Sequence, residues 1–404
     1  MYTDLDDSLI QAISEAGFKT LTPVQKETID PALDGQDLFV SAETGSGKTV
    51  AYLLPTLERL LACQSDATLA LILVPTRELA QQVLRQAKLF ARYTKIKLGL
   101  IGGGTDIKKQ IEYIKQPPQL LIATPGRLSE LLARDLLDFS EVNMLILDEA
   151  DRLLDMGFGD EIIAISEHCA NREQTQLYSA TLASKTLRGL AEKLLTDPTV
   201  VELNKVSDPH KSIQQQIIFA DDKGHKYQLL CWLLKNEEYR HCLVFSNSKE
   251  QTDQLYSLMQ QQGISAGVLH GDKDQKQRNL VMSKMRRDQL KVIIATDVAS
   301  RGLDIEGMDL VINFEMPRRG ELYVHRIGRT GRAGQTGKAI TLIMSTEFNL
   351  MAGIERFLKQ KFERRKIKEL IGNYKGPKKL KASGKAAGTK KKIKKKIKKV
   401  KVKK

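Results

Sequence analysis

Short apolar runs alternate with amphipathic helical stretches along most of the chain. In the first half the runs lie at 37–41, 69–74, 98–101, 119–123, 144–147 and 176–179. A second series follows at 241–245, 266–269, 292–296, 310–314 and 339–344. Continuous apolar runs of this length are typical of strands that are buried on both faces. Their alternation with helices predicts an α/β fold in which a parallel sheet covered by helices occurs twice.

A polar segment separates the two series. Residues 197–215 read DPTVVELNKVSDPHKSIQQ and include two prolines, which is typical of a linker. The length of 404 residues fits two domains of ordinary size. The sequence therefore predicts a first domain over residues 1–207, a second over 208–370 and a tail over 371–404.

The net charge of +15 is concentrated in this tail. Residues 375–404 hold 16 lysines and no acidic residue, so the remaining chain, with 48 basic and 49 acidic residues, carries a net charge of −1. Low complexity and self-repulsion predict that the tail is disordered. An anionic polymer is its expected partner, and a merely solubilising tail is the alternative.

Several classes of protein are disfavoured. The four cysteines form no CxxC pair or His-Cys cluster, which argues against a disulfide framework or a zinc site. The first residues, MYTDLDDSLI, are acidic where a secretory signal is basic, and the longest apolar runs are too short to span a membrane. We expect a cytoplasmic protein without a membrane partner.

The segment SAETGSGKTV, residues 41–50, follows the first apolar run and precedes a helical stretch. A strand, a glycine-rich turn and a helix start form an anion site, because backbone N–H groups and the helix dipole face the ligand. Ala42 stands where the strict GxxxxGK[ST] pattern begins with glycine. We expect Lys48 to meet the β and γ phosphates of ATP and Thr49 to ligate Mg²⁺. The whole expected loop comprises Ala42, Glu43, Thr44, Gly45, Ser46, Gly47, Lys48 and Thr49.

An acidic pair follows another apolar run, in MLILDEAD. A buried strand there delivers Asp148 and Glu149 at its carboxyl end, where ligands bind in open parallel sheets. Adjacent residues that leave a strand point in different directions, so one carboxylate can approach Mg²⁺ while the other reaches a water in line with the γ phosphate. We expect Asp148 on the metal and Glu149 as the general base.

The second half lacks a GK[ST] loop but contains YVHRIGRTGRAG, in which Arg326, Arg329 and Arg332 recur every three residues. Two glycines inside such a helix would cost about 2 kcal/mol, which a solvated basic face would not require. We expect one or more of these arginines to stabilise charge in the transition state. Catalysis then requires the two domains to close.

Further blocks occur in a fixed order over about residues 2–345. They are GFKTLTPVQ (17–25), AETGSGKT (42–49), PTREL (75–79), GG (102–103), TPGR (124–127), DEAD (148–151), SAT (179–181), LVFSN (243–247), HGD with QKQR (270–278), ATDVASRGLD (295–304) and HRIGRTGR (325–332). With these blocks the chain resembles the DEAD-box RNA helicases of superfamily 2, of bacterial type. The resemblance implies two tandem RecA-like domains and an RNA-dependent ATPase.

The resemblance also implies roles for residues that chemistry alone leaves open. Gln25 would read the adenine edge, within a block that includes Phe18, and Tyr2 is the one upstream aromatic that could stack on the base. In the second domain Asp304 would meet the ribose and Gly302 the region of the γ phosphate, while Arg329 and Arg332 would be the arginine fingers. Coupling of hydrolysis to closure would fall on Ser179, Thr181, His325 and Arg326.

RNA contacts follow from the same resemblance. They fall on Thr76, Arg77, Gly103, Thr124 and Arg127 in the first domain and on Gln275, Arg278 and Thr296 in the second. Hydroxyls, loop amides and arginines contact sugar and phosphate, so binding would be largely indifferent to base sequence. The lysine tail could add affinity for structured or ribosomal RNA.

The expected function is ATP-dependent remodelling of single-stranded RNA or short RNA duplexes. An ATP-gated RNA clamp that hardly unwinds, a DNA helicase and a transport ATPase are the alternatives. The last of these is disfavoured because the chain has no LSGGQ-like signature.

Overall fold

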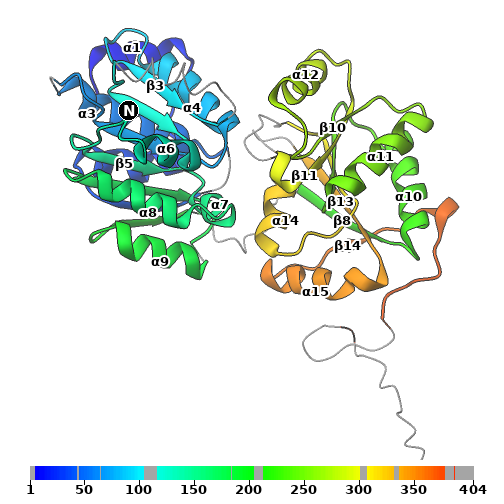
Figure 1. Ribbon diagram of the computed structural model, residues 1–404. Coiled ribbons are helices and arrows are strands. Elements are labelled where there is room, and N and C mark those ends of the chain that lie inside the picture. The colour runs from blue at the N-terminus through cyan, green and yellow to red at the C-terminus, as the bar shows by residue number, and fades with distance from the viewer. Residues whose placement is uncertain are drawn as a thin grey trace, which may run out of the picture.

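The computed structural model describes residues 5–42, 45–63, 65–103, 116–182, 184–203, 213–300, 307–331, 336–377 and 386. Two seven-stranded sheets, each wholly parallel, lie in separate halves of the chain (Figure 1). The predicted repetition of one α/β architecture is therefore confirmed. The predicted boundary at residues 207 and 208, and the lysines from 378 onward, lie outside the described residues.

The first sheet has the strand order β3-β4-β2-β5-β6-β1-β7. Its strands are β1 (Leu38–Ser41), β2 (Ala70–Leu73), β3 (Leu98–Ile101), β4 (Leu120–Ala123), β5 (Met144–Leu147), β6 (Gln174–Ser179) and β7 (Thr199–Glu202). Its helices are α1 (Asp7–Glu15), α2 (Pro23–Leu33), α3 (Lys48–Leu61), α4 (Arg77–Phe90), α6 (Pro125–Leu132), α7 (Ala150–Asp155), α8 (Gly159–His168) and α9 (Lys185–Leu194).

The second sheet has the strand order β10-β11-β9-β12-β13-β8-β14. Its strands are β8 (Ile213–Phe219), β9 (Cys242–Ser246), β10 (Ala266–Leu269), β11 (Val292–Thr296), β12 (Leu310–Asn313), β13 (Gly337–Ile343) and β14 (Glu363–Arg364). Its helices are α10 (Lys223–Asn236), α11 (Lys249–Gln261), α12 (Gln275–Arg286), α13 (Asp297–Ser300), α14 (Gly320–Ile327) and α15 (Phe348–Phe357), with short 3₁₀ turns η1 (Ser345–Glu347) and η2 (Lys368–Leu370).

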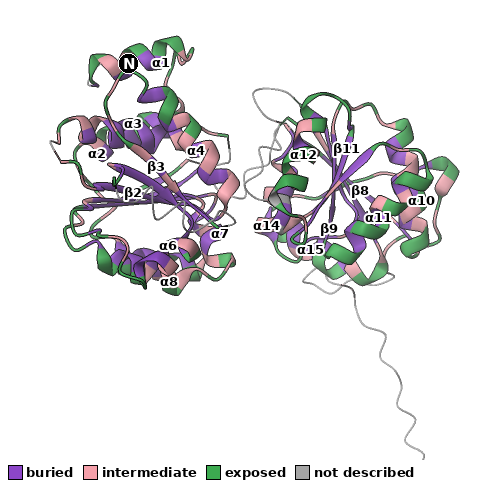
Figure 2. Cartoon of the chain, turned by 45° about the horizontal axis from the view of Figure 1, so that its top comes forward, coloured by how far each residue is buried: buried purple, intermediate pink, exposed green. Residues whose placement is uncertain are grey.

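Each sheet lies between two layers of helices, and its central strands are buried on both faces (Figure 2). In β5, Met144 and Ile146 face the core under α1 to α4, whereas Leu145 and Leu147 face the core under α6 to α9. The alternation of side chains along a strand thus requires apolar residues at every position. This requirement is the physical reason why the central strands were readable as continuous apolar runs.

Three strands were missed by sequence reasoning. β7 and the first three residues of β8 lie inside the segment that was predicted as a linker, and this prediction was wrong for Thr199–Glu202 and for residues 213–215. Only Val201 of β7 is buried, because β7 is an edge strand. β8 carries three consecutive glutamines and β14 has only two residues, so neither shows the continuous apolar pattern of a central strand.

Among the described residues, no helix is long and apolar enough to cross a membrane. The four cysteines, all within the described residues, are free thiols.

A close contact between α14 and α15 makes a specific prediction about stability. A Cβ at Gly320 would lie 2.2 Å from Cδ1 of Phe357, whereas a Cβ at Gly189 in α9 would have no neighbour within 4 Å. We expect Gly320→Ala to lower the free energy of unfolding by about 1–3 kcal/mol through overpacking. Gly189→Ala, the matched control, should raise it by up to about 1 kcal/mol through helix propensity. Urea unfolding measures both, and equal stability of the two variants would contradict the contact.

Candidate active site between the two domains

The glycine-rich loop leads from the carboxyl end of β1 into α3. Gly45 and Gly47 have φ values of 84° and 97°, in the left-handed region that strains other residues. A Cβ at Gly47 would also lie 2.5 Å from Nε2 of Gln25. The turn therefore depends on glycine at this position. Glu43 and Thr44 lie outside the described residues.

Gln25 ties the start of α2 to this loop. Its Oε1 accepts a hydrogen bond from the backbone N–H of Thr22 at 3.0 Å, and its Nε2 donates to the carbonyl of Gly47 at 3.2 Å. The Gln25 side chain is thus held against the loop by bonds at both ends. Phe18, from the same block, packs edge-to-face on Phe90 with 5.6 Å between ring centroids, and this contact belongs to the hydrophobic core. Tyr2 lies outside the described residues.

Lys48 and Asp148 form the buried centre of the site. Lys48 Nζ donates to the carbonyl of Ala42 at 2.5 Å, and burial lowers the pKa of this amine. Burial raises the pKa of Asp148 to about 6, against the opposing effect of the Lys48 charge. The Tyr52 hydroxyl donates to Asp148 Oδ2 at 2.9 Å and also hydrogen-bonds Thr49. Sequence reasoning missed Tyr52, because an aromatic residue in an apolar helical stretch is expected in the core.

The two adjacent carboxylates have different partners. Glu149 has a φ of 52°, a left-handed conformation that is uncommon outside glycine and costs on the order of 1–3 kcal/mol. Its carboxylate pairs with Arg152 Nη1 at 2.7 Å, whereas Asp148 faces Tyr52 and Lys48. Strained residues of this kind cluster at functional sites.

Asp151 connects this centre to the end of β6. Burial raises the pKa of Asp151, and a hydrogen bond from Ser179 opposes that shift. Ser179 Oγ also lies 2.9 Å from the carbonyl oxygen of Thr181 and accepts a hydrogen bond from the Thr181 N–H at 3.2 Å. The SAT block therefore lies directly against the DEAD block.

Two ion pairs and one contact between a histidine and an aspartate join the domains within the part of the chain that the structure describes. Arg278 Nη1 lies 2.6 Å from Glu78 Oε1, and Arg319 Nη2 lies 3.0 Å from Asp155 Oδ1. His325 Nε2 lies 3.5 Å from Asp151 Oδ2. In Figure 1 the latter contact corresponds to α14 of the second domain facing α7 of the first. Sequence reasoning missed Glu78, Asp155 and Arg319, because the sequence alone does not tell which charges of two domains meet.

Arg326 is a buried hub of the second domain, only 1% exposed. Its guanidinium makes a two-pronged ion pair with Asp297 at 2.6 and 2.7 Å and donates to Asn247 at 2.7 Å and to the Glu315 carbonyl at 2.8 Å. It also lies over the ring of Phe245, 5.1 Å from the centroid. These contacts fix α14 on the carboxyl ends of the strands.

Arg329 is one residue beyond the C-cap of α14. It is 5% exposed and lines a small cavity between the domains together with Arg152 and His325. Arg329 therefore lies beside the arginine that pairs with Glu149. Gly302, Asp304 and Arg332 lie outside the described residues.

The expected RNA contacts of the first domain gather at the carboxyl ends of three neighbouring strands, β3, β4 and β2. Thr76 caps α4, and Arg77 Nη1 donates to the carbonyl of Gly103 at 3.3 Å. Thr124 stands at the N-cap of α6, and Arg127 pairs with Glu130 at 3.0 Å. The topology thus brings together five residues that are separated in sequence.

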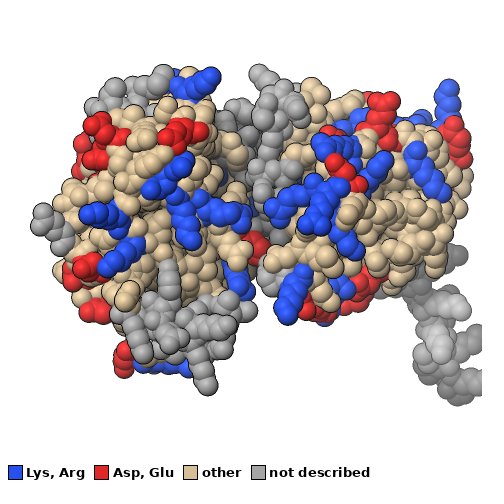
Figure 3. Space-filling view, turned by 90° about the horizontal axis from the view of Figure 1, so that it is seen from above, with Lys and Arg blue, Asp and Glu red and all other residues tan. Residues whose placement is uncertain are grey.

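In the second domain the expected contacts lie at the end of β11, which is Thr296, and at the start of α12, which is Gln275. Arg278 is engaged by Glu78 and by the Ala299 carbonyl at 2.9 Å. Seen from above, Lys and Arg side chains gather on both domains beside the line where they meet (Figure 3).

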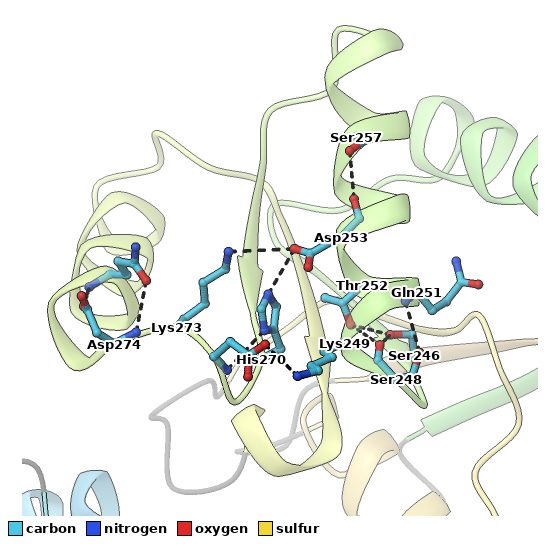
Figure 4. A network of polar contacts seen from close by, with 12 residues as sticks. Ser246, Ser248, Lys249, Gln251, Thr252, Asp253, Ser257, His270, Lys273 and Asp274 are labelled. Atoms are coloured by element: carbon cyan, nitrogen blue, oxygen red, sulfur yellow. Dashed lines mark hydrogen bonds and ion pairs between the residues drawn. The ribbon is translucent and has the colours of Figure 1, made fainter.

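A polar network holds the loop before α12 (Figure 4). His270, 3% exposed, contacts Asp253 of α11 at 3.1 Å, and Lys249 pairs with Asp272 at 2.9 Å. Asp274 then caps α12 by accepting from the N–H of Gln277 at 2.8 Å. The HGD block therefore has a clear positioning role for α12.

The described part of the chain contains no cluster of three or more His, Cys, Asp or Glu side chains that could hold a metal ion.

Comparisons with known proteins agree with this geometry. Residues 22–190 match the family model of the DEAD/DEAH box helicases, and residues 225–334 match that of the helicase conserved C-terminal domain. The chain is 40% identical over 377 residues to the ATP-dependent RNA helicase SrmB of Escherichia coli, with 93% of this chain and 85% of the relative covered. It is 37% identical over 360 residues to the DEAD-box ATP-dependent RNA helicase CshA of Bacillus cereus, with 89% and 68% covered.

Solved structures of related proteins resemble this structure to different degrees. The structure of Dbp5 of S. cerevisiae bound to RNA and ADP BeF3 is similar with a TM-score of 0.81, 28% identity and 90% and 94% of the two chains covered. A DEAD box protein from Methanococcus jannaschii is 35% identical, with 90% and 98% covered, yet has a TM-score of 0.53. The similarity over the whole chain is thus higher to the RNA-bound Dbp5, although its sequence identity is lower.

The ordered blocks, the tandem RecA-like domains and the matches over most of the chain lead to one conclusion. The chain belongs to the DEAD-box family of ATP-dependent RNA helicases, and it is an enzyme of that class.

Proposed function

We propose that the protein holds RNA by its backbone and locally separates short duplexes, or remodels RNA–protein complexes, as its two domains close on ATP. The observation that supports this best is the contact of α7 with α14, where Asp151 and His325 approach to 3.5 Å. This contact brings the DEAD helix of one domain to the arginine-bearing helix of the other. ATP hydrolysis would therefore depend on the relative position of the domains.

We assign the nucleotide to the loop between β1 and α3. Lys48, buried and close to Asp148, would carry positive charge to the β and γ phosphates, and Gln25 is held where it could turn from Gly47 to an adenine edge. The proposed nucleotide contacts are Phe18, Gln25, Ala42, Glu43, Thr44, Gly45, Ser46, Gly47, Lys48, Thr49, Gly302 and Asp304.

The donor set beside this loop suits Mg²⁺. Magnesium prefers oxygen ligands and is commonly held by one or two carboxylates together with substrate phosphates. Thr49 and Asp148 offer a hydroxyl and a carboxylate, and both hydrogen-bond the same Tyr52 hydroxyl, so they lie close together. When bound there, Mg²⁺ would offset negative charge on the phosphate oxygens.

Hydrolysis would use groups from both domains. Glu149 is proposed as the base that takes a proton from the attacking water, since its carboxylate pairs with Arg152 whereas Asp148 bonds Tyr52 beside the loop. Arg329 and Arg332 are proposed to stabilise the charge on the transferred phosphoryl group in the transition state. Ser179, Thr181, His325 and Arg326 would couple that site to closure by holding α7 and α14 in position.

RNA is proposed to lie across the carboxyl ends of both sheets, on Thr76, Arg77, Gly103, Thr124, Arg127, Gln275, Arg278 and Thr296. Because these groups suit sugar and phosphate, little base specificity is expected. When RNA binds, Arg278 would either leave Glu78 or pair with Glu78 and an RNA phosphate at the same time. The lysine tail is proposed to add non-specific affinity, and a cytoplasmic location is proposed from the free cysteines.

The function is tested by ATP turnover with no nucleic acid, with single-stranded RNA and with DNA of the same sequence. We expect RNA to stimulate turnover and DNA to have little effect, and we expect release of a labelled strand from a short RNA duplex. Stimulation without strand release would favour the clamp, and no stimulation by any RNA would refute the proposal. A chain ending at residue 374 should keep its basal turnover but lose part of the salt dependence of RNA binding.

Glu149→Gln keeps the shape of the side chain and removes the proposed base. We expect ATP turnover to slow by roughly 10²–10⁴-fold while ATP and RNA still bind. Glu173→Gln is the matched control. Glu173 also pairs with an arginine, Arg59 at 3.3 Å, but it precedes the start of β6, whereas the DEAD block lies against Ser179 at the other end of that strand. The melting temperature of each variant is measured as well, since Arg152 loses its charged partner. Normal turnover of Glu149→Gln would assign the base elsewhere.

Arg326 and Arg329 should respond differently to truncation. Arg326→Ala leaves Asp297 and Asn247 without their buried partner, so we expect the free energy of unfolding to fall by about 3–5 kcal/mol. Arg329→Ala should instead lower kcat by roughly 10³-fold or more with ATP binding retained. Chemical unfolding and steady-state kinetics, both at a temperature where the variants are folded, separate these effects. A stable Arg326→Ala, or an Arg329→Ala with normal kcat, would contradict the assignment.

A further inference from the structure

One exposed face of α12 carries regularly spaced cations. Lys276, Leu280, Lys284 and Arg287, the C-cap residue, follow one another at intervals of four, four and three, so they lie on one side of the helix. All four are exposed, Leu280 to 55%. We call these four residues the α12 stripe.

The positive charge of the stripe is uncompensated. Residues 275–287 include no Asp or Glu. The structure gives Lys276, Lys284 and Arg287 no ion pair or side-chain hydrogen bond with any residue it describes. The acids nearest in sequence are engaged elsewhere, because Asp274 caps the helix, Asp272 pairs with Lys249 and Asp288 pairs with Arg240. A solvated helix face usually mixes both signs, whereas this face carries positive charge alone, so the pattern indicates a polyanionic ligand.

The position of the stripe relates it to the groove between the domains. α12 begins close to the first domain, where Arg278 meets Glu78. It then runs away from that contact beside β10, the edge strand of the second sheet. With a rise of 1.5 Å per residue, Lys276 and Arg287 are about 16 Å apart along the axis. α12 lies at the top of the second domain in Figure 1, on the side that faces the viewer in Figure 3.

We propose that the α12 stripe binds the sugar-phosphate backbone of an RNA duplex that flanks the strand held between the domains. This proposal rests on the proposed function and extends its RNA path by one surface. A straight row of cations with no aromatic side chain suits phosphates of an A-form helix, which is recognised by shape and backbone. Additional single strand would instead call for aromatic side chains on which bases stack. Leu280 would pack against ribose.

The test uses the full chain and three RNAs, each in the presence of ADP and beryllium fluoride. One RNA is a single strand of about ten nucleotides, and the other two carry the same strand with a hairpin duplex of roughly twelve base pairs at its 5′ end or at its 3′ end. The variant is Lys284→Ala with Arg287→Ala, which removes two exposed cations and keeps good helix formers. The charge-matched control is Lys366→Ala with Lys368→Ala, two exposed lysines next to β14 at the opposite edge of the sheet.

We expect the stripe variant to bind one of the hairpin RNAs about tenfold more weakly at low salt, with a slope of log affinity against log salt reduced by about two. Its affinity for the single strand and its ATP turnover stimulated by that strand should be those of the wild type. The proposal is overturned if the hairpin RNAs bind the variant as they bind the wild type, if the single strand is weakened equally, or if the control variant shows the same loss. Failure of the wild type to bind any RNA would refute the proposed function itself.

Discussion

The buried guanidinium of Arg326 is the interaction on which the arrangement of the second domain depends. It joins Asp297, which follows β11, to Asn247, which follows β9, and to the backbone beyond β12. A charge with 1% exposure is tolerated because every direction of its planar group meets an acceptor. Since α14 carries Arg326, the same contacts direct His325 and Arg329 toward the first domain. A structural arginine thus determines where its neighbours can act.

The first domain presents a complementary surface built on one buried charge cluster. Lys48, Asp148 and Tyr52 are held at the ends of β1 and β5, and the left-handed backbone at Glu149 turns the next carboxylate to Arg152. Asp151 extends this cluster to His325 across the domain boundary. The strain at Glu149 is compatible with a stable fold because tertiary contacts surround it. In the proposed function, these few side chains would link cleavage of a phosphate to the relative position of the domains.

Sequence reasoning was most accurate where burial is complete. Central strands such as β5 and β9 are apolar at every position, so their runs were visible, and the glycine-rich loop was readable from its flanking strand and helix. Edge strands such as β7 are polar on their exposed face and were missed. Phe18, which stays a proposed nucleotide contact, packs its ring on Phe90. The contact of Arg278 with Glu78 was also missed, because its partners belong to different domains.

The sequence by itself determined the two α/β domains, the family and the types of side chain that the candidate site contains. Apolar periodicity and ordered blocks are local properties of the chain, so they can be recognised without the tertiary structure. Only the tertiary structure decided which groups meet. Packing of the strands brings Thr76, Gly103 and Thr124 to one edge, and docking of the domains selects Asp151, Asp155 and Glu78 as the partners of His325, Arg319 and Arg278. Such pairings depend on distances of a few ångströms between residues far apart in the chain, and no local pattern encodes them.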